Sequence, residues 1–245
     1  MKTNNIIISY WFKPLDYNPI SRIQELEKCL DDFIKPCLVS NAPISHNLNI
    51  PRIQTTNKER KSFFSLSMIN CIVNLNVEGK DNDELILFIN ENMQLYMDIL
   101  KDIFDIDIIY SSVKMEFQEK DIDANKFLIK KYDLKGKDLE DINIKKVERV
   151  DDYYISYNIC SGHEINYNFT ISNQEDKPTD EDLYFRGMVT SVKDAVSETP
   201  ILSVGIEIND RYAYNENPSF RSSKESIRGI VQELRKLLDK DIKEY

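Results

Sequence analysis

The chain has 245 residues, of which 41% are hydrophobic and 10% aromatic, so it can bury a core as one large domain or two small ones and is not globally disordered. Its formal net charge of -10 opposes a nucleic-acid partner, because the protein and the phosphate backbone repel one another at long range. It holds only 6 glycines and 2 histidines, and the glycines lie too far apart to form a GxGxxG turn or a P-loop. These numbers exclude the usual nucleotide-binding folds and most histidine-based chemistry.

The residues after the first lysine, Asn4 to Ile8, lack the apolar stretch and the cleavage site of a signal peptide. No stretch of the sequence reaches the roughly 20 apolar residues of a membrane span. We therefore expect a cytoplasmic protein without membrane association. The 4 cysteines have no CxxC spacing, which indicates reduced and mostly buried thiols instead of a metal site or a disulfide framework. We expect no cofactor and no metal.

The first half of the chain predicts an alternation of strands and helices. A strand is expected over 6–12, and then a helix whose apolar residues recur at helical spacing from Ile20 to Phe33, with Asn18 and Pro19 at its start. A long loop is expected over 37–50, followed by a meander of strands over 52–56, 62–68 and 71–77 with a polar turn at 57–60. A second helix begins at the capping box of Asp81 and Glu84 and continues to Ile103, and a strand over 109–117 follows it.

The second half repeats this style. It predicts a short helix over 119–133, a charged connection, and a β-hairpin of strands 153–159 and 165–171 with strict alternation. Further strands are expected over 183–192 and after Pro200. The last helix is predicted to be capped by Ser222 with Glu225 three positions on, and its apolar face contains Leu234. The sequence therefore predicts an α+β protein of two halves, 1–118 and 119–245, each an antiparallel β meander packed by long amphipathic helices.

Four segments carry a resemblance to a known family. They are strand and turn patterns, namely Ile6-Ile7-Ile8-Ser9-Tyr10-Trp11-Phe12-Lys13-Pro14-Leu15, Pro51-Arg52-Ile53-Gln54, Val113-Lys114-Met115-Glu116-Phe117 and Val204-Gly205-Ile206-Glu207-Ile208. Together they resemble a sporadically distributed, uncharacterised prokaryotic family of two-part proteins of about this size. That family closes with an aromatic-led segment after its last helix, whereas residues 239–245 here are mainly charged. The resemblance implies a fold type and a patchy, mobile-element style of distribution, and it implies no reaction and no site residue.

Candidate catalytic groups are sparse. A two-metal nuclease needs clustered carboxylates with a lysine, and the nearest sets are Glu207 with Asp210, and Asp151 and Asp152 with Lys145 and Lys146. Neither set is complete. Cys160 and His163 are the one nucleophile and base that lie close in sequence, although a buried structural thiol is the simpler interpretation. The basic stretch over 126–149 is interrupted by acidic residues and is typical of a solvated surface.

The segment 209–221, between the last strand and the last helix, is the strongest candidate for recognition. It concentrates residue types that anchor interfaces, since they bury area and keep a polar group to pair: Arg211, Tyr212, Tyr214, Asn215, Asn217, Phe220 and Arg221. An ordinary loop whose tyrosines pack on the domain edge is the competing interpretation. If the segment binds, Tyr212 and Tyr214 should be partly exposed between firmly packed elements.

The leading hypothesis is a non-enzymatic binding or regulatory protein that acts through protein contacts, with a protein partner or a second copy, in a defence or mobile-element locus as the resemblance implies. The alternative is a divergent metal-dependent hydrolase or nuclease that uses Asp151, Asp152, Glu207 and Asp210.

Overall fold

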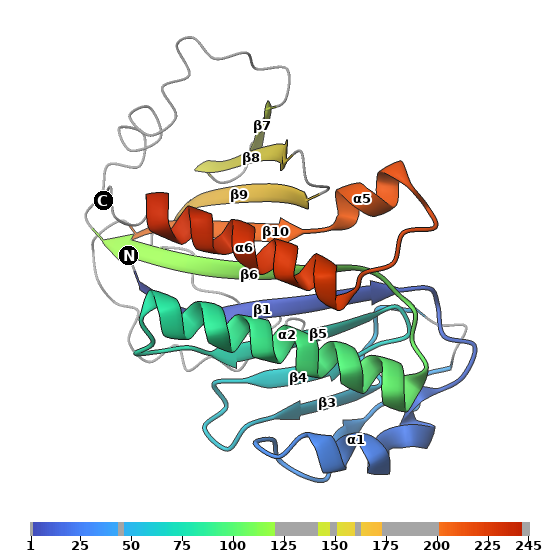
Figure 1. The fold of residues 1–245 in the computed structure, drawn as a ribbon. Coiled ribbons are helices and arrows are strands. Elements are labelled where there is room, and N and C mark those ends of the chain that lie inside the picture. The colour runs from blue at the N-terminus through green and yellow to red at the C-terminus, as the bar shows by residue number, and fades with distance from the viewer. Residues whose placement is uncertain are drawn as a thin grey trace.

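A computed structural model describes residues 2–43, 47–120, 142–147, 151–159, 163–172 and 201–241. Within this part of the chain, ten strands form one antiparallel sheet in the order β2-β3-β4-β5-β1-β6-β10-β9-β8-β7, with helices packed against it (Figure 1). The α+β class is therefore confirmed. Strands from both predicted halves belong to this single sheet, because β6, which lies almost entirely in the first half, pairs with β10 of the second.

The bounds of the elements are as follows. The strands are β1 (Lys2–Phe12), β2 (Leu38–Val39), β3 (Ile53–Thr56), β4 (Phe63–Leu66), β5 (Asn70–Asn76), β6 (Ile108–Lys120), β7 (Ile142–Val147), β8 (Asp151–Ile159), β9 (His163–Ser172) and β10 (Ile201–Asn209). The helical elements are the 3-10 turn η1 (Pro19–Arg22) and the helices α1 (Ile23–Cys29), α2 (Asn82–Phe104), α5 (Arg211–Glu216) and α6 (Lys224–Asp241).

The core lies between the sheet and the helices α2 and α6, which cover the same face (Figure 1). Alternate residues of each central strand point to this face, as the two-residue period of a strand requires, so Ile6, Ile8 and Tyr10 are fully buried while Ile7 and Ser9 between them are half-buried. The Tyr10 side chain extends across the core, and its hydroxyl donates a hydrogen bond of 2.5 Å to the carbonyl of Met93 in α2. The buried phenol is thus satisfied by the backbone of the covering helix.

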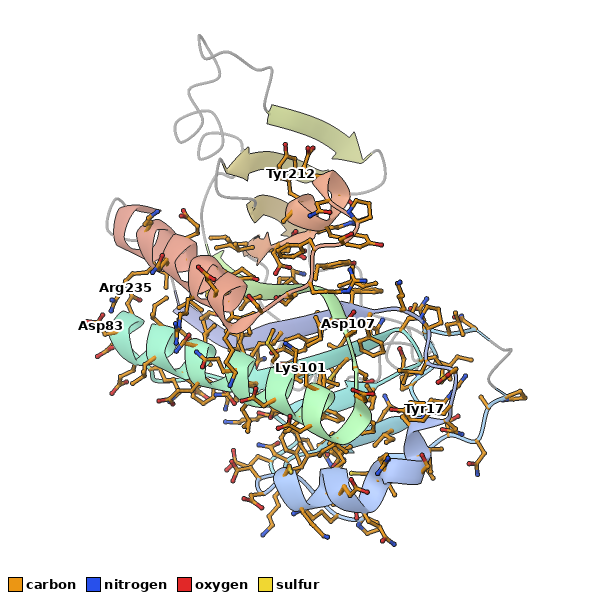
Figure 2. The ribbon with its side chains drawn as sticks, turned by 45° about the vertical axis from the view of Figure 1, so that its right-hand side comes forward. Tyr17, Asp83, Lys101, Asp107, Tyr212 and Arg235 are labelled. Carbon is orange, nitrogen blue, oxygen red and sulfur yellow. The ribbon has the colours of Figure 1, made fainter. Side chains whose placement is uncertain are left out.

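Two ion pairs connect α2 to α6 at the surface. Lys224 Nζ lies 2.7 Å from Asp98, and Arg235 lies 2.6 Å from Asp83 at the opposite ends of the two helices (Figure 2). The helices therefore run antiparallel. Both pairs are largely exposed, so each contributes at most about 1 kcal/mol and the buried apolar seam between the helices dominates the stability.

Helix starts show where the sequence prediction succeeds and where it fails. The capping box of Asp81 and Glu84 is confirmed at the start of α2. The predicted cap Ser222 of the last helix is wrong, because Ser223 caps it: the Ser226 N–H donates to Ser223 Oγ at 3.3 Å, and the Ser223 N–H donates to Ser226 Oγ at 3.0 Å. The Ser222 hydroxyl is engaged by Asp210 instead, at 2.7 Å.

The predicted helix over 20–33 is wrong beyond Cys29. The chain leaves helical geometry at Leu30, whose φ is -101 and ψ is 65, and Phe33 forms an isolated bridge with Asn57. Leu30 and Phe33 are buried all the same. The apolar spacing of these residues therefore indicates that they contact the core, and a turn can place them there as well as a helix can. The expected loop over 37–50 also contains the edge strand β2.

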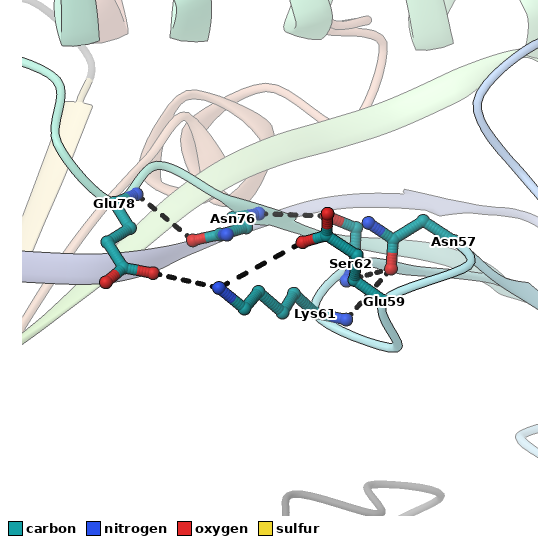
Figure 3. A network of polar contacts seen from close by, with 6 residues as sticks. All are labelled: Asn57, Glu59, Lys61, Ser62, Asn76 and Glu78. Atoms are coloured by element: carbon teal, nitrogen blue, oxygen red, sulfur yellow. Dashed lines mark hydrogen bonds and ion pairs between the residues drawn. The ribbon is translucent and has the colours of Figure 1, made fainter.

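The first meander is confirmed, since β3, β4 and β5 follow one another in the sheet with antiparallel pairing. Polar side chains tie its first turn to the end of β5 (Figure 3). Asn57 Oδ1 accepts hydrogen bonds from the N–H groups of Lys61 and Ser62 at 2.8 and 3.1 Å, and Ser62 Oγ accepts from the Asn76 N–H at 3.0 Å. Lys61 Nζ then reaches the Glu78 carboxylate at 3.0 Å.

The hairpin of β8 and β9 and the strand β10 after Pro200 are confirmed. The predicted helix over 119–133 begins inside β6, because Glu119 and Lys120 pair with β10 there. The remainder of that helix and the strand predicted over 183–192 lie outside the described residues. The boundary predicted between residues 118 and 119 likewise falls within β6.

Candidate functional site

The candidate recognition segment 209–221 leaves the sheet at the end of β10, forms the short helix α5, and enters α6. Helix α5 lies against β6 and β9, and Figure 2 shows Tyr212 on it near the upper strands. Tyr212, Tyr214 and Phe220 are half-buried, while Arg211 and Asn217 are exposed. The tyrosines are therefore partly exposed, between a strand and a helix whose apolar residues, Ile208 and Ile227, are buried.

A buried carboxylate fixes the start of this segment. Asp210 is 1% exposed, and its Oδ1 accepts a hydrogen bond of 2.6 Å from the backbone N–H of Ser111 in β6. Its Oδ2 accepts from the Ser222 hydroxyl at 2.7 Å, and the Ser111 and Ser222 hydroxyls also lie 2.7 Å apart. Burial raises the pKa of Asp210 to about 6, even though the hydrogen bonds from Ser111 and Ser222 lower it. One side chain thus connects β6, the segment 209–221 and the start of α6.

Arg221, predicted as a binding residue, fastens the other end of the segment. Its Nε donates to the Asp107 carboxylate at 2.5 Å, and its Nη1 donates to the carbonyls of Pro218 and Phe220 at 2.9 and 2.6 Å. Three of its donor contacts are therefore within the protein. We assign Arg221 to holding the loop in shape, and Arg211 is the arginine of this segment whose guanidinium remains exposed.

Arg211 lies on an aromatic pair that the sequence did not reveal. Its guanidinium carbon is 5.8 Å from the centre of the Tyr110 ring, within range of a cation–π interaction. Tyr110 in turn stacks on Trp11 of β1, with ring centres 5.8 Å apart and planes 18° apart. Burial raises the pKa of Tyr110, and the charge of Arg211 opposes that rise.

The stack forms because Trp11 and Tyr110 are directly opposed in the register of β1 and β6. Both lie on the face opposite the buried Tyr10, where no helix among the described elements other than α5 approaches. Trp11 is the single tryptophan of the chain. A lone half-exposed tryptophan on the polar side of a strand is a usable signal, but only the β1–β6 register shows that it meets Tyr110.

The carboxylates considered for catalysis fall into two separate places. Strand β9 lies between β8 and β10, and across it Asp152 of β8 is level with Ser203 of β10. Ser203 lies four residues before Glu207 in β10. Two strand spacings of about 4.8 Å and four residues of about 3.3 Å place the Cα atoms of Asp152 and Glu207 about 16 Å apart. Asp210 lies beyond Glu207 along the chain, and its carboxylate already accepts hydrogen bonds from Ser111 and Ser222. The register therefore separates the pair Asp151 and Asp152 from the pair Glu207 and Asp210.

Other predicted chemistry lies outside the described parts of the chain. This applies to Cys160, to the side chains of His163, Asp151 and Asp152, and to the basic residues 126–141. Within the described residues, no group of three or more His, Cys, Asp or Glu side chains could hold a metal ion, and no helix is long and apolar enough to cross a bilayer. Of the thiols in this part, Cys37 and Cys71 are buried and Cys29 is exposed, and all three are free.

No protein-family model and no curated protein matches this sequence.

Proposed function

We propose that this protein is a non-enzymatic binding or regulatory protein whose contact surface is the segment 209–221. The observation that carries the proposal is a segment that is bonded to the rest of the protein at both ends and presents partly exposed aromatic side chains. Asp210 fixes one end to β6, Arg221 fixes the other to Asp107, and Tyr212 and Tyr214 stand between them. Ordering such residues in advance lowers the entropic cost of association, because their rotamers and backbone are already restricted.

The residue types suit a protein partner or a second copy of the chain. Tyrosine and arginine dominate interface energetics since each buries a large area while a polar group stays available for pairing. Nucleic acid is a poor candidate, because the net charge of -10 opposes a polyanion. We place the protein in a defence or mobile-element locus on the strength of the family resemblance alone.

We also propose that the chain consists of two related halves. The central strands β1 and β6 lie side by side, and each is followed outward by four strands, β5-β4-β3-β2 on one side and β10-β9-β8-β7 on the other. A covering helix follows the strand next to the centre on each side, α2 after β5 and α6 after β10. This topology supports a boundary before Ile108 of β6, eleven residues ahead of the one predicted from the sequence.

The test combines self-association and capture of a partner. Wild type, Tyr214→Ala and the control Leu87→Ala, which removes an exposed apolar side chain on α2, would be compared by sedimentation velocity and by affinity capture from cells of the source organism. We expect Tyr214→Ala alone to weaken the association, by about 2 kcal/mol or roughly 30-fold in Kd, with an unchanged Tm. Equal association of all three proteins would exclude the segment as the contact surface.

A further inference from the structure

The exposed guanidinium of Arg211 has an aromatic neighbour, and no carboxylate of the described residues neutralises it. Its guanidinium carbon lies over the Tyr110 ring, and Trp11 of the neighbouring strand stacks on Tyr110. Stacking on an aromatic face uses the flat side of a guanidinium and leaves the N–H groups at its edge available, which is why a stacked arginine can still bind a planar anion. Arg211 is also anchored through its backbone, whose N–H donates to Asn209 Oδ1 at 3.0 Å.

Among the described residues, no carboxylate forms an ion pair with Arg211. Three other arginines in this part of the chain do have such partners: Arg22 has Glu25, Arg221 has Asp107 and Arg235 has Asp83. The adjacent Asp210 is turned inward to Ser111 and Ser222, and Glu207 has an interaction of its own. Within the described part of the chain, this guanidinium is therefore exposed and has no carboxylate partner.

Resting on the contact surface proposed above, we propose that Arg211, which lies over the Tyr110 ring of the Trp11–Tyr110 stack, binds a carboxylate side chain in an acidic segment of a protein partner. The fork of guanidinium N–H groups matches the two oxygens of a carboxylate, and such charge-assisted pairs are stronger than neutral hydrogen bonds. Tyr212 and Tyr214 are half-buried residues of the same short helix and offer aromatic area for apolar residues that flank the acid.

Charge favours such a segment over a nucleic acid. A single-stranded nucleic acid carries a phosphate at every residue and meets the field of the whole protein, with its net charge of -10. A short peptide segment brings one or two carboxylates, and the direct contact with Arg211 outweighs the weak screened repulsion from distant charges.

The single tryptophan makes the site directly observable, because Trp11 belongs to the stack and all tryptophan emission comes from it. Four probes would be titrated while this emission is recorded: acetyl-Ala-Glu-Leu-Glu-Ala-amide, the matched peptide with glutamine in place of glutamate, inorganic phosphate, and single-stranded oligo(dT). We expect a saturable change with the glutamate peptide and none with the glutamine peptide. No saturable response to the glutamate peptide, or tighter binding of phosphate or oligo(dT), would overturn the proposal.

Variants give a second measure of the same site. Arg211→Gln should weaken binding of the glutamate peptide at least about tenfold, and Arg211→Lys should weaken it less, since lysine keeps the charge and loses the planar fork. Arg228→Gln, which removes an exposed arginine of α6, is the matched control and should bind as wild type does. Unchanged binding in Arg211→Gln contradicts the assignment.

The two proposals fail in different ways. If Tyr214→Ala loses the partner while Arg211→Gln keeps it, the segment is a contact surface and carboxylate recognition by Arg211 is wrong. If neither variant loses it, the contact surface itself is wrong.

Discussion

The sharpest stability prediction concerns Asp210, which is buried and has a raised pKa. Its value of about 6, against an ordinary 3.8, means that the folded protein favours the neutral carboxyl. The stabilisation from proton uptake is complete below about pH 4 and is lost as the pH rises through about 6. The difference between the two pKa values corresponds to about 3 kcal/mol of stabilisation in all. About 1 kcal/mol of this stabilisation is lost between pH 5 and pH 7.

The variant Asp210→Asn removes this titration and keeps the shape of the side chain. Its amide oxygen can still accept from the Ser111 N–H, and its amide N–H can donate to Ser222 Oγ, which is able to accept when its own proton turns to Ser111. Urea denaturation at pH 5, 6 and 7 gives the free energy of unfolding of both proteins. From pH 7 to pH 5, wild type should gain about 1 kcal/mol relative to Asp210→Asn.

Asp102→Asn is the matched control, because Asp102 is an exposed carboxylate on α2. Its difference from wild type should stay constant over the same pH range. A constant difference for Asp210→Asn, or a loss of wild-type stability relative to Asp210→Asn from pH 7 to pH 5, would show that the buried site does not favour the neutral acid and that the explanation by burial is wrong.

Two further predictions test the packing of the helices. Leu234→Ala should lower the free energy of unfolding by about 2 to 5 kcal/mol in urea denaturation, since this side chain of α6 is 1% exposed; an unchanged value together with binding of an apolar dye would mean that the stripe of α6 faces solvent. Tyr10→Phe should cost about 1 to 3 kcal/mol by the same method, because the Met93 carbonyl loses a buried donor; a cost near zero would indicate that water replaces the hydroxyl.

Some features of the candidate recognition segment could be predicted from the sequence and others could not. Residue types alone predict a contact surface at 209–221, because tyrosines and arginines concentrate there between a strand and a helix with regular apolar patterns. The roles of its two arginines could not be separated in this way. Arg221 meets Asp107 and Arg211 meets Tyr110 through contacts more than 100 residues apart in the chain, and local composition carries no information on such distances.

The sequence by itself determined the local elements whose cause is local. The capping box at Asp81, the alternation in β8 and β9, and the turn at Asn57 each depend on residues a few positions apart, and all are present. The tertiary structure alone decided what depends on distant partners. It ended α1 at Cys29 although apolar spacing continues to Phe33, and it moved the cap of α6 from Ser222 to Ser223. It also joined strands of both predicted halves in one sheet through the β6–β10 pair. The physical reason is the same throughout. The spacing of apolar residues shows only that they recur at a regular interval, whereas the surface on which each side chain packs and the group to which it bonds are fixed only when the sheet is assembled.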